Sequence, residues 1–157
     1  MIIRSFLFLL FIFSTLPSDL HAADALRFNR PVPLRAQGAI EVYAKESLQP
    51  SLTGLSIAAT DLNNDGINEF IIRDQACPAP AEPCRYVVLG DTEQGIVLLG
   101  DFQAREIMLG NSFSHGVRDL LVKDSEGNDF IFGQYVWDAQ TSRYTMVNKG
   151  DASIHAR

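Results

Sequence analysis

One ten-residue connection, DLNNDGINEF at positions 61–70, concentrates side chains that can hold a cation. Its spacing, D-x-N-x-D-G-x-x-E, places side-chain oxygens at four positions: Asp61, Asn63, Asp65 and Glu69. Calcium takes about six to eight oxygen ligands at about 2.4 Å, and alternate residues of a curled loop can direct their oxygens toward one centre. Gly66 permits the positive φ that such a bend needs, and the carbonyl of Ile67 stands where a backbone ligand is expected. These residues therefore predict a site for one calcium ion.

A tight turn without metal is the alternative interpretation of the same connection. Asn-Asp-Gly between apolar runs is a hairpin signal by itself. Asp and Asn side chains are also frequent in turns because they bond the local backbone. Turn formation alone, however, does not require Asp61 and Glu69 to stand symmetrically about the bend. We therefore favour the calcium site and keep the metal-free turn as the alternative.

The first half of the connection matches the calcium loop of the EF-hand. The second half departs from it, because Ile72 occupies the twelfth position in place of a glutamate and the flanking runs are strand-like. The stretch TDLNNDGINEFII resembles the calcium loop of FG-GAP or VCBS-type β-repeats, in which D-x-D-x-D-G-x-x-D joins two strands of one blade. The resemblance implies a β-rich fold and the calcium ligands named above. Asn63 and Glu69 replace two aspartates of that pattern, and the charge lost at Asn63 is expected to weaken binding to about 10⁻⁵–10⁻³ M.

The two cysteines, Cys77 and Cys84, lie in the segment ACPAPAEPC, with six residues between them, three of which are proline. In an oxidising compartment a disulfide that closes this short loop is expected, and it should contribute about 2 kcal/mol to stability. A metal pair is the alternative, but no third or fourth Cys or His stands nearby in the sequence. The combination of a DLNxDGxxEF loop with a cysteine-closed loop and later hairpins resembles certain bacterial exported proteins. That resemblance implies a fold and a compartment, but no activity.

Residues 1–22 have the features of a secretory signal. Arg4 supplies a basic start, residues 6–16 are almost continuously apolar, and cleavage after Ala22 fits best. The apolar run is too short to cross about 30 Å of hydrocarbon. We therefore expect residues 23–157 to form a single exported β-rich domain, periplasmic or secreted, without a membrane span.

The expected mature chain is acidic. Arg4 and Asp19 are the charged residues within 1–22 and cancel each other, so the net charge of −6 is unchanged by cleavage. Binding to a phosphate backbone needs a basic surface. We therefore expect no nucleic-acid partner.

Periodicity predicts one helix followed by strands. From about 38 to 49, Ile40, Ala44 and Leu48 share one helical face, and Pro50 ends the helix. Eight β-rich runs separated by turn residues follow: LSIAATDL, INEFIIR, RYVVLG, GIVLLG, REIMLG, VRDLLVK, DFIFGQYVW and RYTMVN. Most are continuously apolar, which is typical of strands covered on both faces or covered by a helix. We expect an α+β domain whose N-terminal helix packs on a mainly antiparallel meander or sandwich of about eight strands.

An internal similarity relates INEFIIRD at 67–74 to VRDLLVKD at 117–124, fifty residues later. This pattern suggests two blade-like repeats that arose by duplication. Chance similarity among strands rich in Val, Leu and Ile is the alternative. A closed propeller usually needs at least about four blades. An open meander or sandwich is therefore favoured over a ring.

No motif assembles a catalytic site. His115 stands near Ser112, Ser114 and Asp119 in the sequence, but no G-x-S-x-G nucleophile elbow is present. A turn histidine beside Gly116 is the favoured interpretation. No phosphate-binding glycine loop or dinucleotide fingerprint occurs either.

The late aromatic residues, Phe130, Phe132, Tyr135, Trp137 and Tyr144, are expected mainly in the core, with Trp137 opposite Tyr144 across a turn. If they were exposed together, they would form the docking surface for a glycan or a protein.

These observations favour a non-enzymatic, calcium-stabilised binding module of the bacterial cell envelope. Its partner would be an envelope protein or a glycan, and inhibition of a wall-degrading enzyme is one form such binding could take. An envelope hydrolase with an acidic site or a site based on His115 is the alternative. A concave pocket that joins His115 or two carboxylates would favour the hydrolase, and an exposed acidic or aromatic face would favour the binding module.

Overall fold

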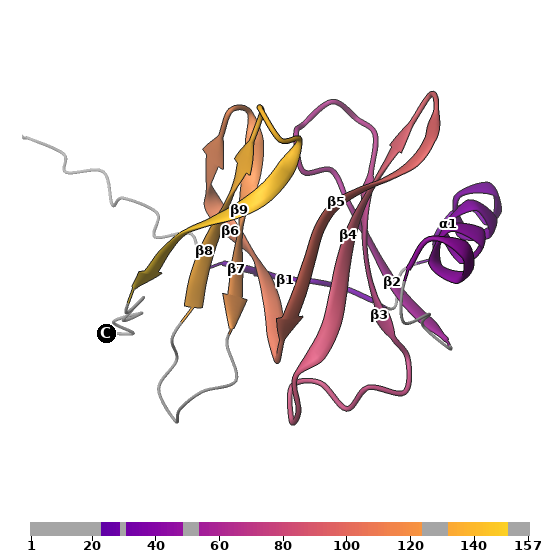
Figure 1. Ribbon diagram of the computed structural model, residues 1–157, viewed down its shortest axis with the longest axis horizontal. Coiled ribbons are helices and arrows are strands. Elements are labelled where there is room, and N and C mark those ends of the chain that lie inside the picture. The colour runs from indigo at the N-terminus through magenta and orange to yellow at the C-terminus, as the bar shows by residue number, and fades with distance from the viewer. Residues whose placement is uncertain (1–22, 29–30, 49–53, 124–131, 151–157) are drawn as a thin grey trace, which may run out of the picture.

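The computed structural model describes residues 23–28, 31–48, 54–123 and 132–150, so the predicted signal, residues 1–22, lies outside the described residues. Its elements are β1 (Asp24–Ala25), α1 (Leu34–Glu46), β2 (Leu55–Thr60), β3 (Glu69–Asp74), β4 (Cys84–Thr92), β5 (Gly95–Ala104), β6 (Glu106–Ser114), β7 (Val117–Lys123), β8 (Phe132–Asp138) and β9 (Arg143–Gly150). The strands form two antiparallel sheets, in the orders β2-β3-β4-β5 and β1-β6-β7-β8-β9. Figure 1 shows three layers, with α1 outside the first sheet and the second sheet on its other side. The expected class, mainly antiparallel β with one helix, is confirmed for the described residues.

The helix begins four residues earlier than the sequence predicts. The carbonyl of Pro33 accepts a hydrogen bond from the N–H of Gln37 at 2.9 Å, so the first turn forms directly after the proline. Gly38, the predicted start, lies inside the helix because a glycine weakens a helix by only about 1 kcal/mol. The earlier start adds Ala36 to the buried face that also contains Ile40. The last helical residue is Glu46, against a predicted end at about 49.

The first sheet is covered on both faces. Ile57, Ile72 and Val87 lie side by side on three neighbouring strands and pack with the buried face of α1. Ile71 and Val88 point to the opposite face and pack in a core that the second sheet shares. Because successive side chains of a strand alternate between faces, two covered faces require continuously apolar strands. This explains the unbroken apolar runs of β3 and β4.

The shared core contains aromatic contacts, one between the two sheets and one within the second sheet. The rings of Phe102 on β5 and Tyr135 on β8 pack edge to face, with centroids 4.7 Å apart. Trp137 on β8 pairs with Tyr144 on β9, and their rings also meet edge to face at 5.7 Å. Phe132 and Tyr144 are buried, and Tyr135 and Trp137 are half-buried. The late aromatic residues therefore serve mainly as core, as predicted, except that Phe130 lies outside the described residues.

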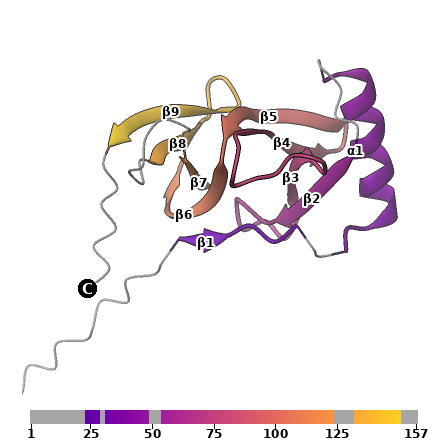
Figure 2. The same ribbon diagram turned by 90° about the horizontal axis from the view of Figure 1, so that it is seen from below.

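The N-terminal segment runs along both sheets before it reaches α1, as Figure 2 shows. Strand β1 pairs with β6 and forms one edge of the second sheet, and the carboxylate of Asp24 forms an ion pair with Arg118 on β7 at 2.9 Å. Farther along, the ring of Phe28 lies 4.6 Å from the guanidinium carbon of Arg73 on β3. The segment thus contacts elements of both sheets. Within the described residues, no helix has the length and apolar character needed to cross a membrane.

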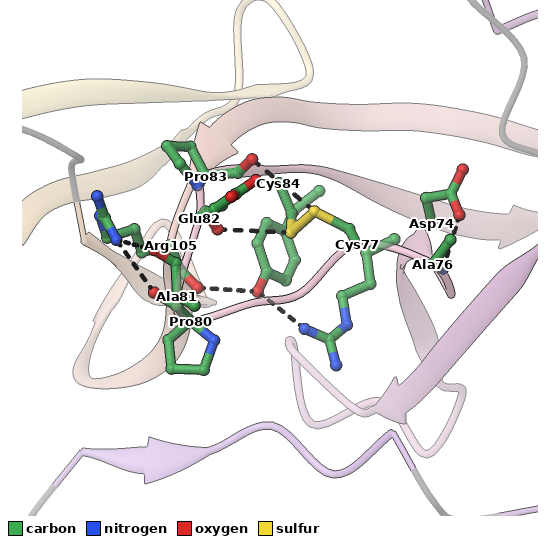
Figure 3. Close-up of a disulfide and its surroundings, with 11 residues drawn as sticks. Asp74, Ala76, Cys77, Pro80, Ala81, Glu82, Pro83, Cys84 and Arg105 are labelled. Atoms are coloured by element: carbon green, nitrogen blue, oxygen red, sulfur yellow. Dashed lines mark hydrogen bonds between the residues drawn. A yellow bond between two sulfur atoms is a disulfide. The ribbon is translucent and has the colours of Figure 1, made fainter.

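The predicted disulfide between Cys77 and Cys84 is present (Figure 3). It closes the connection between β3 and β4, and Cys84 is buried in the shared core. The guanidinium group of Arg105 donates to the carbonyls of Pro80 and Ala81 inside the closed loop. The disulfide therefore closes the loop on itself, and the contacts of Arg105 hold the loop against the β5–β6 connection.

The helix packing can be tested by replacing Ile40, which is fully buried against the first sheet. Ile40→Ala should lower the free energy of unfolding by about 2–5 kcal/mol, because it removes transfer free energy and leaves a cavity. Val42→Ala, on the exposed face of the same helix, should change it by less than about 0.5 kcal/mol. Urea unfolding followed by circular dichroism measures both. Equal effects of the two substitutions would contradict the packing described here.

Candidate functional site

The acidic connection between β2 and β3 folds its side chains back onto its own backbone. The two carboxylate oxygens of Asp61 accept hydrogen bonds from the N–H groups of Asp65 at 3.2 Å and Gly66 at 2.9 Å. The amide oxygen of Asn63 accepts from the same N–H of Asp65 at 3.1 Å. Because one donor serves both side chains, the oxygens of Asp61 and Asn63 face the same point.

Asp65 is held at the centre of the bend. Its carboxylate accepts from the N–H of Ile67 at 2.7 Å and from the side-chain amide of Asn63 at 2.8 Å. The backbone reverses through two residues with positive φ, Asn64 at 59° and Gly66 at 86°. Glycine adopts this conformation without steric cost, and Asn tolerates it better than most residues. The local sequence therefore produces the curled loop that was predicted.

Glu69 reaches back across the loop from the first position of β3. Its carboxylate accepts a hydrogen bond from the N–H of Leu62 at 2.7 Å. Burial raises the pKa of Glu69, and the negative charges of Asp65 and Asp61 add to the increase, while the Leu62 hydrogen bond opposes it. A carboxylate that must ionise here is therefore destabilised by its surroundings.

Leu62 connects the loop to the second sheet. Its side chain is fully buried in the shared core, and its carbonyl accepts a hydrogen bond from the N–H of Arg118 on β7 at 2.7 Å. The peptide groups of Leu62 are thus bonded on one side to Glu69 and on the other to the neighbouring sheet. The acidic connection is fixed between the two sheets.

The predicted calcium ligands are brought together in part. The side chains of Asp61, Asn63 and Asp65 turn inward, and Glu69 closes the loop from the other end. Ile67 is exposed and its N–H, bonded to Asp65, contributes to the bend. Nevertheless, among the described residues no three His, Cys, Asp or Glu side chains are arranged to hold a metal by themselves. The donor set is all oxygen, which suits calcium, but the carboxylates are engaged by the loop's own donors.

A cavity of about 220 Å³ lies beside this loop. Asn63, Asp65 and Glu69 of the loop are among its lining residues, together with Asp91 from the β4–β5 hairpin and Trp137 from β8. In Figure 1 the connections β2–β3, β4–β5, β6–β7 and β8–β9 gather at this end of the molecule, at the top of the view. Sequence reasoning did not place Asp91 or Trp137 near the loop. The Trp137–Tyr144 pairing was predicted, but nothing in the sequence relates that hairpin to residues 61–69.

The residues that could resemble a catalytic triad do not assemble as one. His115 has a positive φ of 51° next to Gly116 and turns β6 into β7, as predicted for a turn histidine. Its Nδ1 lies 3.1 Å from the carbonyl oxygen of Trp137. The hydroxyl of Ser112 donates to Asp119 at 2.5 Å, and that carboxylate is buried. In the described structure His115 forms no hydrogen bond with either member of this pair.

Comparisons of the chain with protein-family models, with curated proteins and with solved structures find no match.

The raised pKa of Glu69 predicts how its replacement depends on pH. In metal-free buffer, ionised Glu69 destabilises the folded state at pH 7, and this contribution vanishes as the pH falls below 4.5, the usual value for a glutamate. Relative to the wild type, Glu69→Gln should therefore gain stability at pH 7 and lose that advantage at pH 4. Urea unfolding at both pH values measures the difference. Glu93→Gln, an exposed acid on the β4–β5 turn, is the control; a pH-independent difference for Glu69→Gln would contradict the burial argument.

Proposed function

We propose that this chain is an exported, non-enzymatic binding module of the bacterial cell envelope, and that one calcium ion stabilises its acidic connection. The ligands would be Asp61, Asn63, Asp65, Glu69 and the carbonyl of Ile67. The proposal includes the secretory signal at 1–22 and a periplasmic or secreted location. The described disulfide is compatible with that location, because disulfides persist in oxidising compartments.

One observation carries the calcium proposal: the side-chain oxygens of Asp61 and Asn63 accept from the same N–H, that of Asp65. Side chains used only for a solvated turn need not share a donor, whereas ligands of one ion must face one centre. Each carboxylate oxygen has two lone pairs, so an oxygen that accepts from an amide retains a position for a cation. A bound ion would also remove the repulsion among the three carboxylates of the loop.

The arrangement of the acidic side chains limits the affinity. Since no three of them already form a metal group in the part of the chain that is described, the ion would have to draw the carboxylates of the loop closer together. Binding in the range of about 10⁻⁵–10⁻³ M, typical of weak extracellular sites, is consistent with that requirement.

We further propose that the two sheets are blade-like repeats. Strands β2–β5 and β6–β9 are both four-stranded antiparallel meanders. The similar segments 67–74 and 117–124 contribute the second strand of each meander, β3 and β7. Equivalent positions in two meanders are what a duplication would produce.

The binding role is supported by the cavity beside the acidic connection, which is lined by residues of the β2–β3 connection, the β4–β5 hairpin, β7 and β8. Binding residues concentrate on connections that a rigid scaffold positions. The same cavity joins the carboxylates of Asp65, Glu69 and Asp91, which is the feature expected of the alternative, an envelope hydrolase with an acidic site, so that alternative is retained. A hydrolase based on His115 is less favoured, because His115 is not among the lining residues.

Calorimetry of the purified protein tests the calcium proposal. In EDTA followed by 5 mM calcium, the melting temperature should rise by several degrees, corresponding to about 2 kcal/mol for an ion at about 50 times its dissociation constant. The variant Asp61→Asn with Asp65→Asn should lose this rise, since both carboxylates are removed with little change in shape. Glu93→Gln should retain it. Identical melting curves of the wild type with and without calcium would refute the proposal.

A further inference from the structure

The lining of the cavity beside the acidic connection combines apolar and acidic residues. Leu99, Val117 and Trp137 form an apolar wall, whereas Asp65, Glu69 and Asp91 supply carboxylates. No Lys, Arg or His is among the described residues that line it. A cavity that combines an aromatic face with unneutralised acids is suited to a ligand that is cationic at one end and apolar along its length.

Trp137 is held firmly in this wall. Its indole ring meets the ring of Tyr144 edge to face, and its carbonyl oxygen lies 3.1 Å from Nδ1 of His115 in the neighbouring hairpin. Tyr144 is buried, and its hydroxyl donates to the carbonyl of Arg118 at 2.8 Å. The aromatic face is therefore preorganised, and a cation near the face of a tryptophan gains about 0.5–2 kcal/mol, the larger value where water is excluded.

Glu69 is the half-buried acid of this lining. Its carboxylate accepts from the N–H of Leu62, and the two ion pairs found in the described structure, Arg85–Asp101 and Arg118–Asp24, do not include it. A carboxylate partly removed from water without a positive partner gains more from a cation than an exposed one does. The structure thus leaves a negative charge beside a cavity that could admit its counter-ion.

We propose that this cavity binds a primary alkylammonium group, with the ammonium at Glu69 and the alkyl chain along the Trp137 wall. The volume of about 220 Å³ is below the roughly 300–1,000 Å³ typical of pockets for drug-sized ligands. A single chain of the size of a lysine side chain matches this space. The ligand is therefore a lysine side chain presented by a partner, or a free amine of similar length.

An ammonium suits these carboxylates better than a guanidinium does. Asp61 and Asp65 each use both oxygens for donors within the loop, and Glu69 uses one for Leu62. A guanidinium binds most favourably through two parallel hydrogen bonds to one carboxylate, whereas an ammonium is a compact charge with three separately directed donors. The loop offers single acceptor positions on different carboxylates, and this arrangement suits an ammonium.

This inference names the ligand of the proposed binding module and does not depend on calcium. The proposed calcium ligands include Glu69, so an ion at that residue would compete with the amine. The experiment is therefore run in EDTA, which removes calcium. Its result then tests amine binding alone, whether or not the protein binds calcium.

Trp137 is the single tryptophan of the chain, so its fluorescence reports directly on the cavity. Titration of the purified protein with n-butylammonium chloride, in phosphate buffer at constant ionic strength, should give a saturable change in that fluorescence. n-Butanol, which has a similar apolar chain without the charge, should give none. The absence of a saturable response to the ammonium, or an equal response to butanol, would overturn the proposal.

Variants test whether butylammonium binds at this cavity or is attracted by the acidic surface in general. Glu69→Gln should weaken butylammonium binding at least tenfold, and Asp91→Asn, on the exposed hairpin, should weaken it about threefold. Glu93→Gln removes the same charge from the β4–β5 turn outside the described lining and should change binding less than twofold. Normal binding by both Glu69→Gln and Asp91→Asn would overturn the assignment of the site, whether or not either variant is less stable.

A second titration distinguishes the two sources of the amine. N-acetyl-lysine methylamide carries the same ammonium on a peptide-like stem. If it binds as butylammonium does, the cavity accepts a lysine side chain of a protein partner. If only butylammonium binds, the ligand is a free amine, and the ammonium site itself is retained.

Discussion

The peptide groups of Leu62 form the contact on which the arrangement of this protein depends. The N–H bonds to the carboxylate of Glu69, the carbonyl accepts from Arg118 in the second sheet, and the side chain is buried between the sheets. An unpaired peptide group at this depth would cost about 1–3 kcal/mol. The loop is therefore secured to both sheets, and its acidic side chains have a defined position rather than a solvated one.

That position has an electrostatic consequence. Three carboxylates lie on one short connection, and Glu69 is half-buried, so burial and its neighbours raise its pKa. A cation reduces the repulsion among carboxylates that are held close together, and either a metal ion or an organic ammonium could act in this way. Backbone N–H groups of the loop stabilise the charges of Asp61 and Asp65 by hydrogen bonds, and the N–H of Leu62 does so for Glu69. Glu69 is half-buried and lines the same cavity as Trp137.

Much of the fold follows from local patterns. The continuous apolar runs predicted strands covered on two faces, and β3 and β4 lie between α1 and the second sheet. The disulfide and the Trp137–Tyr144 pair were predicted from spacing across short loops, and both are present. The predicted start of α1 at about 38 was wrong by four residues, because the carbonyl of Pro33 already begins the helical hydrogen bonds and Gly38 lies inside the helix. A single glycine is a weak signal, and burial of Ala36 outweighs it.

The sequence by itself determined the features that depend on residues close together in the chain: the curled acidic loop, the cysteine-closed loop, the hairpins and the amphipathic helix. These form through short-range hydrogen bonds, backbone preferences and alternation of side chains. Only the tertiary structure decided that Trp137 and Asp91 stand beside Glu69, and that Leu62 is bonded to Arg118. Such contacts are set by how the two sheets pack, and packing depends on the fit of many distant apolar side chains at once.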